Sequence, residues 1–96
     1  MRVFLNKFGD LLNSRPLGRE ALAAFQTQLV NLAENENLEL DFDGVFTLTP
    51  SWGDEFLTPL VKQYGSRLVL VNTENLSVVA TLKLLEQINK IPFNIK

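Results

Sequence analysis

The 96-residue sequence contains no cysteine and no histidine. Without cysteine the chain has no disulfide, no thiolate metal site and no thiol nucleophile. Without histidine it lacks the side chain that titrates near neutral pH, and with it most hydrolase triads. An enzyme with this sequence would have to use carboxylate, lysine, tyrosine or hydroxyl groups alone, so we expect a protein without a catalytic site, a metal or any other cofactor.

Basic clusters and long apolar runs are also missing. Nine Lys and Arg are scattered among eleven Asp and Glu, for a formal charge of -2, whereas nucleic-acid binding needs clustered positive charge. No stretch approaches the roughly 18 uncharged apolar residues of a membrane span, and the first residues lack a long apolar core. We therefore expect no nucleic-acid partner, no membrane association and a cytoplasmic protein.

The chain does contain enough apolar sequence for one core. Hydrophobic residues make up 46% and charged residues 21% of the sequence, without a biased tract, a linker or an internal repeat. We expect residues 1–96 to fold as a single domain. The composition leaves the oligomeric state open.

Apolar patterns predict strands that alternate with helices. Short apolar or alternating runs predict strands at residues 3–5, 38–42 and 67–71, the last of them covered on both faces. Helical spacing predicts a first helix from near Pro16 to about Ala33, whose buried row would contain Leu17, Ala21, Phe25, Leu29 and Leu32. A second helix is expected after a Thr49 cap with Pro50 at its first position, ending at Gly65, and a third after a cap at Asn72 or Thr73, ending by Asn89.

This order predicts an α/β fold with three helices and a mostly parallel or mixed sheet of about four strands. Residues 91–96 are a candidate edge strand, because proline is tolerated where a ladder donor is not needed. Such an edge could also carry self-association. Residues 45–48 are apolar enough to pack under the sheet.

Polar residues gather where the strands are expected to end. In an open α/β sheet, partners and ligands meet the loops at the carboxyl ends of the strands, next to helix starts. We expect Arg15 and Arg19 to face the acids of this region. The candidate protein-binding residues are Ser14, Arg15, Arg19, Asp41, Asp43, Thr49, Ser51, Trp52, Asp54 and Glu55. The same charges could instead form a half-exposed ion-pair network that fixes a loop against a helix.

The acidic residues allow a second interpretation. Asp41 and Asp43 at a strand end, with Thr49 further on, are similar to the magnesium site of a receiver domain. The chain would then be a small phosphoryl- or nucleotide-sensing domain or a metal-dependent enzyme. Against this, a receiver has five strand-helix units, and no glycine-rich phosphate loop is present. Asp54 and Glu55 are helix neighbours about 100° apart, so they do not form a carboxylate dyad.

A resemblance narrows these choices. The segment from Leu40 to Ser51 resembles the STAS signature, in which an aspartate-bearing strand leads through a Gly-Val turn into a serine-rich helix start. Most of the chain is similar to a bacterial STAS-like family of unknown function, distantly similar to anti-sigma-factor antagonists. The motifs that carry the resemblance are Phe8-Gly9, Ser14-Arg15 with Gly18-Arg19, Asp41-Phe42-Asp43-Gly44-Val45, and Ser51-Trp52-Gly53-Asp54-Glu55. It implies a regulatory, protein-binding signalling module with a STAS-like fold.

The antagonist resemblance also implies a partner and a switch. In that family a serine at the amino end of the second major helix is phosphorylated by a GHKL-type ATPase, so a GHKL-type ATPase or an anti-sigma-like factor is the implied partner. Aligned on Val45, this chain has Pro50 at the phosphoserine position. Thr49 and Ser51 on either side are therefore the candidate phosphorylation sites. We expect the surface from Thr49 to Glu55, flanked by Arg15 and Arg19, to dock on the partner.

Overall fold

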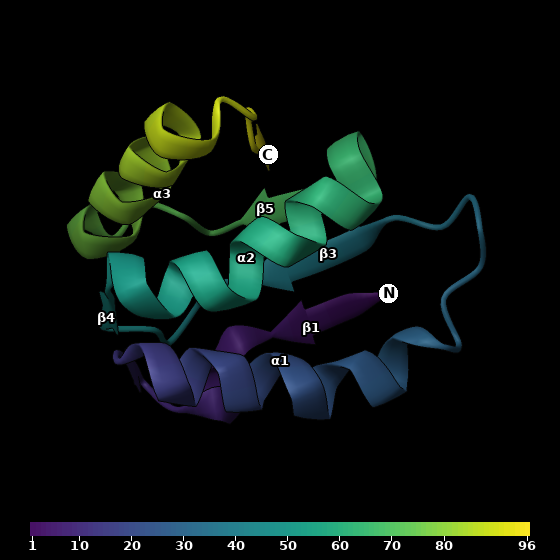
Figure 1. Ribbon diagram of the computed structural model, residues 1–96, viewed down its shortest axis with the longest axis horizontal. Helices are drawn as coiled ribbons and strands as arrows, with labels where there is room; N and C mark the ends of the chain where they lie inside the picture. The colour runs from purple at the N-terminus through teal and green to yellow at the C-terminus, as the bar shows by residue number, and fades with distance from the viewer.

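Four parallel strands form the main sheet, and three helices connect them (Figure 1). This computed structural model describes all 96 residues. The strands, in their order across the sheet, are β1 (Arg2–Phe4), β3 (Leu38–Asp41), β5 (Leu68–Val71) and β6 (Asn94–Ile95). The helices are α1 (Arg15–Leu29), α2 (Pro50–Tyr64) and α3 (Leu76–Asn89), with short 3-10 turns η1 (Leu5–Phe8) and η2 (Gly65–Arg67). The predicted α/β fold is confirmed, and the C-terminal edge strand is present as β6.

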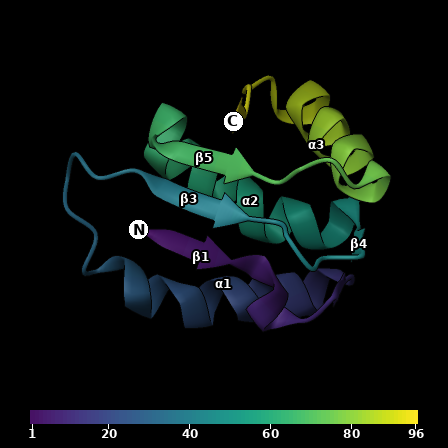
Figure 2. The same cartoon turned by 180° about the vertical axis from the view of Figure 1, so that it is seen from behind.

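All three helices lie on one face of the sheet. Each strand of the main sheet pairs with the one that precedes it in this sheet along the chain, and right-handed crossovers then place every connecting helix on the same side. Figure 2 shows no helix across the back of β1, β3 and β5. Val69 and Val71 lie on this back face, outside the apolar core cluster, in register with Glu39 and Asp41. All four residues of β5 are nevertheless buried, so the prediction that this strand is covered on both faces is confirmed, although helices cover only the front face.

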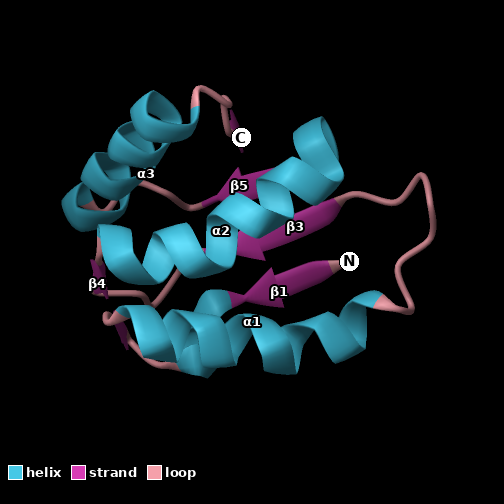
Figure 3. Cartoon of the chain, viewed as in Figure 1, coloured by secondary structure: helices cyan, strands magenta, loops and turns pink.

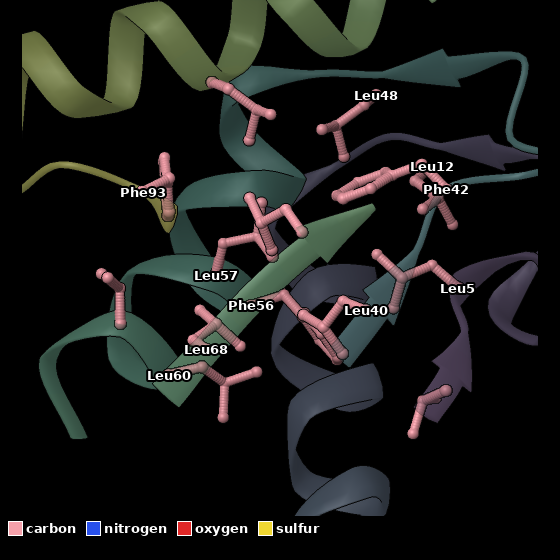
Figure 4. Packing of buried hydrophobic residues seen from close by; sticks show 14 of the residues in the cluster. Leu5, Leu12, Leu40, Phe42, Leu48, Phe56, Leu57, Leu60, Leu68 and Phe93 are labelled. Carbon is pink, nitrogen blue, oxygen red and sulfur yellow. The ribbon is translucent and has the colours of Figure 1, made fainter. Parts of the chain in front are cut away.

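The core fills the space between the helices and the front of the sheet. Leu40 and Leu68 from adjacent strands meet Phe56 and Leu57 of α2 in this layer (Figure 4). Phe56 is stacked on Trp52, with ring centroids 4.7 Å apart. The cluster contains 22 buried residues, and full burial of each large apolar side chain stabilises the fold by about 1.5–3 kcal/mol. This layer therefore holds α2 and its amino end in a fixed position.

A second, two-stranded sheet was not predicted. β2 (Leu11–Leu12) pairs in parallel with β4 (Thr47–Leu48), beyond the end of the main sheet (Figure 3). Leu48 points into the core, but Phe46 is 66% exposed. The Phe46 N–H donates to the Asp10 carbonyl at 2.8 Å, which holds this residue at the rim. The prediction that residues 45–48 pack under the sheet was therefore wrong for Phe46.

Two helix boundaries differ from their predictions. α1 ends at Leu29 rather than Ala33, and Leu17 is exposed rather than part of the buried row. α3 is capped by Asn75, not by Asn72 or Thr73: its side-chain Oδ1 accepts hydrogen bonds from the Ser77 and Val78 N–H groups at 2.8 and 3.3 Å. A side chain can cap a helix only from the residue at its start, so the predicted caps were three and two residues too early.

The predicted ends of α2 are confirmed. Thr49 is its cap, and the side-chain Oγ1 accepts a hydrogen bond from the Trp52 N–H at 3.4 Å. Pro50 occupies the first turn, where its missing N–H has no helical partner to lose. Gly65 closes the helix with a φ of +58°, a conformation that glycine adopts without steric cost.

Candidate functional site

Four charged side chains meet where α1 and α2 begin. We call Arg15, Arg19, Asp54 and Glu55 the charged group. Arg15 Nη1 donates to Asp54 Oδ2 at 2.9 Å and to Glu55 Oε1 at 3.3 Å, and Arg19 Nη2 donates to Glu55 Oε1 at 3.4 Å. The predicted contact between arginines and acids is therefore confirmed for Asp54 and Glu55.

A close contact between the two helices makes this group possible. α1 and α2 lie side by side and begin at the same end of the molecule (Figures 1 and 3). Gly18 on α1 faces the α2 backbone: a Cβ added there would lie 2.7 Å from the Trp52 carbonyl oxygen. Only glycine allows this approach without displacement, and it brings the first turn of α1 within reach of the first turns of α2.

The hydrogen bonds of the charged group shift its proton equilibria. The bond from Arg15 lowers the pKa of Asp54, against the opposite effect of burial, and the Thr58 hydroxyl adds a second bond. Asp54 and Glu55 in turn raise the pKa of Arg15 by accepting its hydrogen bonds. Both partners are thus held in their charged forms. All four side chains keep part of their surface in solvent, so the group remains accessible to another protein.

Three hydroxyl-bearing residues border the charged group. Ser14 caps α1, since its Oγ accepts the Leu17 N–H at 3.3 Å. Thr49 caps α2, and its hydroxyl also donates to the Leu12 carbonyl at 3.4 Å. Ser51 is half-buried in the first turn of α2. Thr49 and Ser14 therefore have structural roles that are sufficient to explain them.

Two of the predicted surface residues lie inside the protein. Trp52 is buried against Phe56 in the core. Asp41 is 1% exposed: its Oδ2 accepts from Arg2 Nη2 at 2.7 Å, and its Oδ1 accepts from Asn72 Nδ2 and the Asp43 N–H, each at 2.9 Å. We correct the prediction for both residues, because a side chain without exposed surface cannot contact a partner.

The contacts of Asp41 also bear on the receiver-like hypothesis. Burial alone would raise the pKa of Asp41, but hydrogen bonds from Asn72, Arg2 and the Asp43 N–H outweigh it and lower the pKa. Each carboxylate oxygen is thus already occupied by donors of this chain. Asp43 is exposed beside Glu74 at an open depression of about 390 Å³, and no group of three or more His, Cys, Asp or Glu side chains is placed to hold a metal ion.

Sequence reasoning missed three exposed apolar residues at the end of the molecule that carries the charged group. Leu11, Leu17 and Phe46 are exposed at the same end of the molecule, where β2 and β4 pair and α1 begins. The signal was weak, because each of these residues belongs to a run that also contains buried side chains. Together they give this end a mixed apolar and charged surface.

Comparison with known protein families matches residues 25–78 to the STAS-like domain of unknown function (DUF4325). The match covers more than half of the chain. The protein belongs to this STAS-like family. No curated protein and no solved structure matches the chain. The predicted family is confirmed, while the distant similarity to anti-sigma-factor antagonists stays a prediction.

The STAS-like match extends from α1 through β3 and α2 to the first residues of α3. It therefore includes Asp54 and Glu55 but not Arg15 or Arg19, which precede it. No helix of this STAS-like protein combines the length and apolarity needed to cross a membrane.

Proposed function

We propose that this STAS-like chain is a non-catalytic regulatory module that binds another protein through the end of the molecule where α1 and α2 begin. The observation that carries the proposal is the charged group, together with the exposed Leu11, Leu17 and Phe46 at the same end of the molecule. Protein interfaces combine apolar contact area with charged and hydrogen-bonding groups at a rim. Arginine is a type of residue that often dominates such contacts, and here Arg15 Nη1 already donates to two acids.

The identity of the partner is a further part of the proposal. The resemblance to anti-sigma-factor antagonists favours a GHKL-type ATPase or an anti-sigma-like factor. The same resemblance favours phosphorylation of Thr49 or Ser51 by such a partner. The Thr49 hydroxyl already caps the helix and donates to the Leu12 carbonyl, so Ser51 is the better phosphorylation site. A phosphate on Ser51 would meet the amino end of α2, which favours negative charge.

An exchange of charges separates a structural role from a binding role. In the double variant Arg15→Asp with Asp54→Arg, an ion pair can form again between the same positions, but the charges that a partner meets are reversed. We expect the double variant to keep the thermal midpoint of the wild type, because exposed ion pairs contribute little to stability. We expect it to lose capture of its partner in affinity purification followed by mass spectrometry.

The controls for this experiment are the single variant Arg15→Asp and the distant variant Lys96→Gln. The single variant should also lose the partner, whereas Lys96→Gln should retain it, because Lys96 is exposed after β6, at the far edge of the main sheet. Retention of the same partner by the exchanged variant would show that the charged group only fixes α1 against α2. The docking proposal would then be wrong.

A further inference from the structure

The outer face of α3 is apolar where a surface helix is normally polar. Leu76 is 84%, Leu84 38% and Ile88 63% exposed, and Ala80 is exposed as well. Solvent-facing positions of a helix are expected to carry charged and polar residues. The opposite face of α3 packs into the core through the buried side chains of Val78, Leu82 and Leu85. The outer apolar residues are therefore not needed for the fold.

These four side chains form one continuous ridge. Leu76, Ala80, Leu84 and Ile88 follow each other at intervals of four residues, the spacing that places side chains in a row on a helix surface. From Leu76 to Ile88 the row is about 18 Å long, at ~1.5 Å per residue. Figure 1 shows α3 at the outer edge of the molecule, across α2 from α1. We call this row the α3 ridge.

Within α3, the exposed charge beside the ridge is positive, whereas Glu74 is exposed two residues before the helix begins. Lys83 is exposed on the same side of the helix, and Lys90 follows at its carboxyl end. The only acid within α3, Glu86, is half-buried, and its Oε2 accepts the Phe93 N–H at 2.7 Å. The ridge thus offers apolar contacts bordered by positive charge, with no exposed carboxylate inside the helix.

This combination favours one kind of occupant. We propose that the α3 ridge binds an amphipathic helix of another protein whose apolar row is flanked by acidic side chains. Such a helix would place its own apolar residues, spaced at i, i+3 and i+4, against the ridge, and its carboxylates within reach of Lys83 and Lys90. The inference does not depend on the charged group, which lies at the starts of α1 and α2.

Two other occupants fit the charges less well. A second copy of the chain, packed antiparallel about the middle of the ridge, would bring the two Lys83 side chains towards each other, and like charges oppose one another across an interface. A lipid surface attracts helices that are rich in Lys and Arg, whereas α3 offers only Lys83, with Lys90 at its cap, on a protein with a formal charge of -2. Both occupants are nevertheless distinguishable by experiment.

A pair of synthetic peptides tests the proposal. One is a helical peptide of about 18 residues with leucines at i, i+3 and i+4 and glutamates beside them, and the other has lysine in place of every glutamate. We expect the acidic peptide to shift the amide NMR signals of α3 in a saturable titration and the basic peptide to leave them unchanged. Lys83→Glu should reverse this preference.

Variants of the ridge complete the test. Leu84→Gln with Ile88→Gln should weaken binding of the acidic peptide at least about tenfold, equivalent to about 1.4 kcal/mol, without lowering the thermal midpoint. Val30→Gln, which replaces a still more exposed apolar residue at the cap of α1, should change nothing.

Three results would overturn the proposal. The first is absence of saturable shifts on α3, or equal binding of both peptides. The second is a dimer in sedimentation experiments that the Leu84→Gln, Ile88→Gln variant abolishes, which would assign the ridge to a second copy. The third is flotation of the protein with vesicles containing about one-third phosphatidylserine, lost in the same variant, which would assign it to a lipid surface.

Discussion

At the scale of single residues, Asp41 joins its own strand β3 to two segments that are distant in sequence. It accepts hydrogen bonds from Arg2 on β1, from Asn72 after β5 and from the backbone of its own loop. Asp41→Asn keeps the size of the side chain but removes the charge and turns one acceptor into a donor. We expect a loss of about 1–3 kcal/mol in the free energy of unfolding, measured by urea denaturation.

The matched control for this variant is Asp43→Asn. Asp43 is exposed, and its side chain forms no ion pair, so its loss should change stability by less than about 0.5 kcal/mol. Equal stability of the Asp41→Asn variant and the wild type would mean that the three donors find other acceptors, and that Asp41 does not hold the sheet together.

The same residue gives a pH dependence of known sign. Because the pKa of Asp41 is lowered in the folded protein, the folded chain binds the proton more weakly than the unfolded chain does. The stabilisation is therefore complete above the unfolded pKa of about 3.9 and is lost as the pH falls through the lower, folded pKa. The stability difference between the wild type and Asp41→Asn should be constant near pH 6 and shrink below about pH 4. A constant difference down to pH 2 would contradict this account.

The partner of Asp41 could not be predicted from the sequence, although its position at a strand end could. Arg2 and Asp41 lie on adjacent strands, and their contact depends on the register that pairs Arg2 with Glu39 and Phe4 with Asp41. A shift of one residue would place Arg2 and Asp41 on opposite faces. The position of Arg15 was easier to predict, because successive helices of a βαβαβ arrangement run parallel and begin at the same end of the sheet.

At the scale of elements, the contact between α1 and α2 depends on Gly18. A Cβ at this position would lie 2.7 Å from a backbone oxygen of α2, and a backbone cannot rotate aside as a side chain can. Gly18→Ala should therefore lower the free energy of unfolding by about 1–3 kcal/mol, measured by thermal or urea denaturation, in spite of the higher helix propensity of alanine.

Gly53 provides the matched control, since it is also a buried helical glycine. A Cβ there would lie 3.1 Å from a Leu85 methyl group and 3.2 Å from a Thr81 methyl group, and both are ends of side chains that can move. Gly53→Ala should therefore cost clearly less than Gly18→Ala. The reverse order would mean that α1 and α2 separate easily and that the contact at Gly18 does not position the charged group.

Element boundaries were predictable where one local signal decides them. The Thr49-Pro50 start and the Gly65 end of α2 depend on cap geometry that the sequence displays directly. The start of α3 was mispredicted because Asn72, Thr73 and Asn75 are all competent caps. The choice of Asn75 involves a tertiary contact, in which its side-chain amide also donates to the Val45 and Phe46 carbonyls at 3.3 and 3.0 Å.

At the scale of the whole molecule, the strand order explains which surfaces are free. The strands of the main sheet lie side by side in the order in which they occur along the chain, so the connecting helices pack side by side on one face. Each of the two outer helices therefore has one uncovered side. β2 and β4 were not predictable because each has two residues, fewer than any periodic pattern requires. Their pairing brings Leu11 and Phe46 to the end where α1 and α2 begin.

The C-terminal segment forms the edge of the main sheet opposite β1. Phe93 is buried in the core, and the Lys96 N–H donates to the Leu70 carbonyl at 2.9 Å. A chain that ends at Lys90 would lose Phe93 and expose the edge of β5. We expect a loss of at least about 3 kcal/mol in the free energy of unfolding, measured by urea denaturation, so truncation tests folding as well as self-association.

Ile95→Lys separates these two effects. Ile95 is half exposed on β6, so the substitution leaves Phe93 and the pairing with β5 in place while it adds charge to the edge, where lysine opposes strand pairing between molecules. Because β6 has only two residues, we expect the wild type and Ile95→Lys to sediment alike at every concentration, with equal thermal midpoints. A wild-type dimer that Ile95→Lys converts to a monomer would show that β6 pairs between copies, and that this edge is an interface in addition to the two helix surfaces.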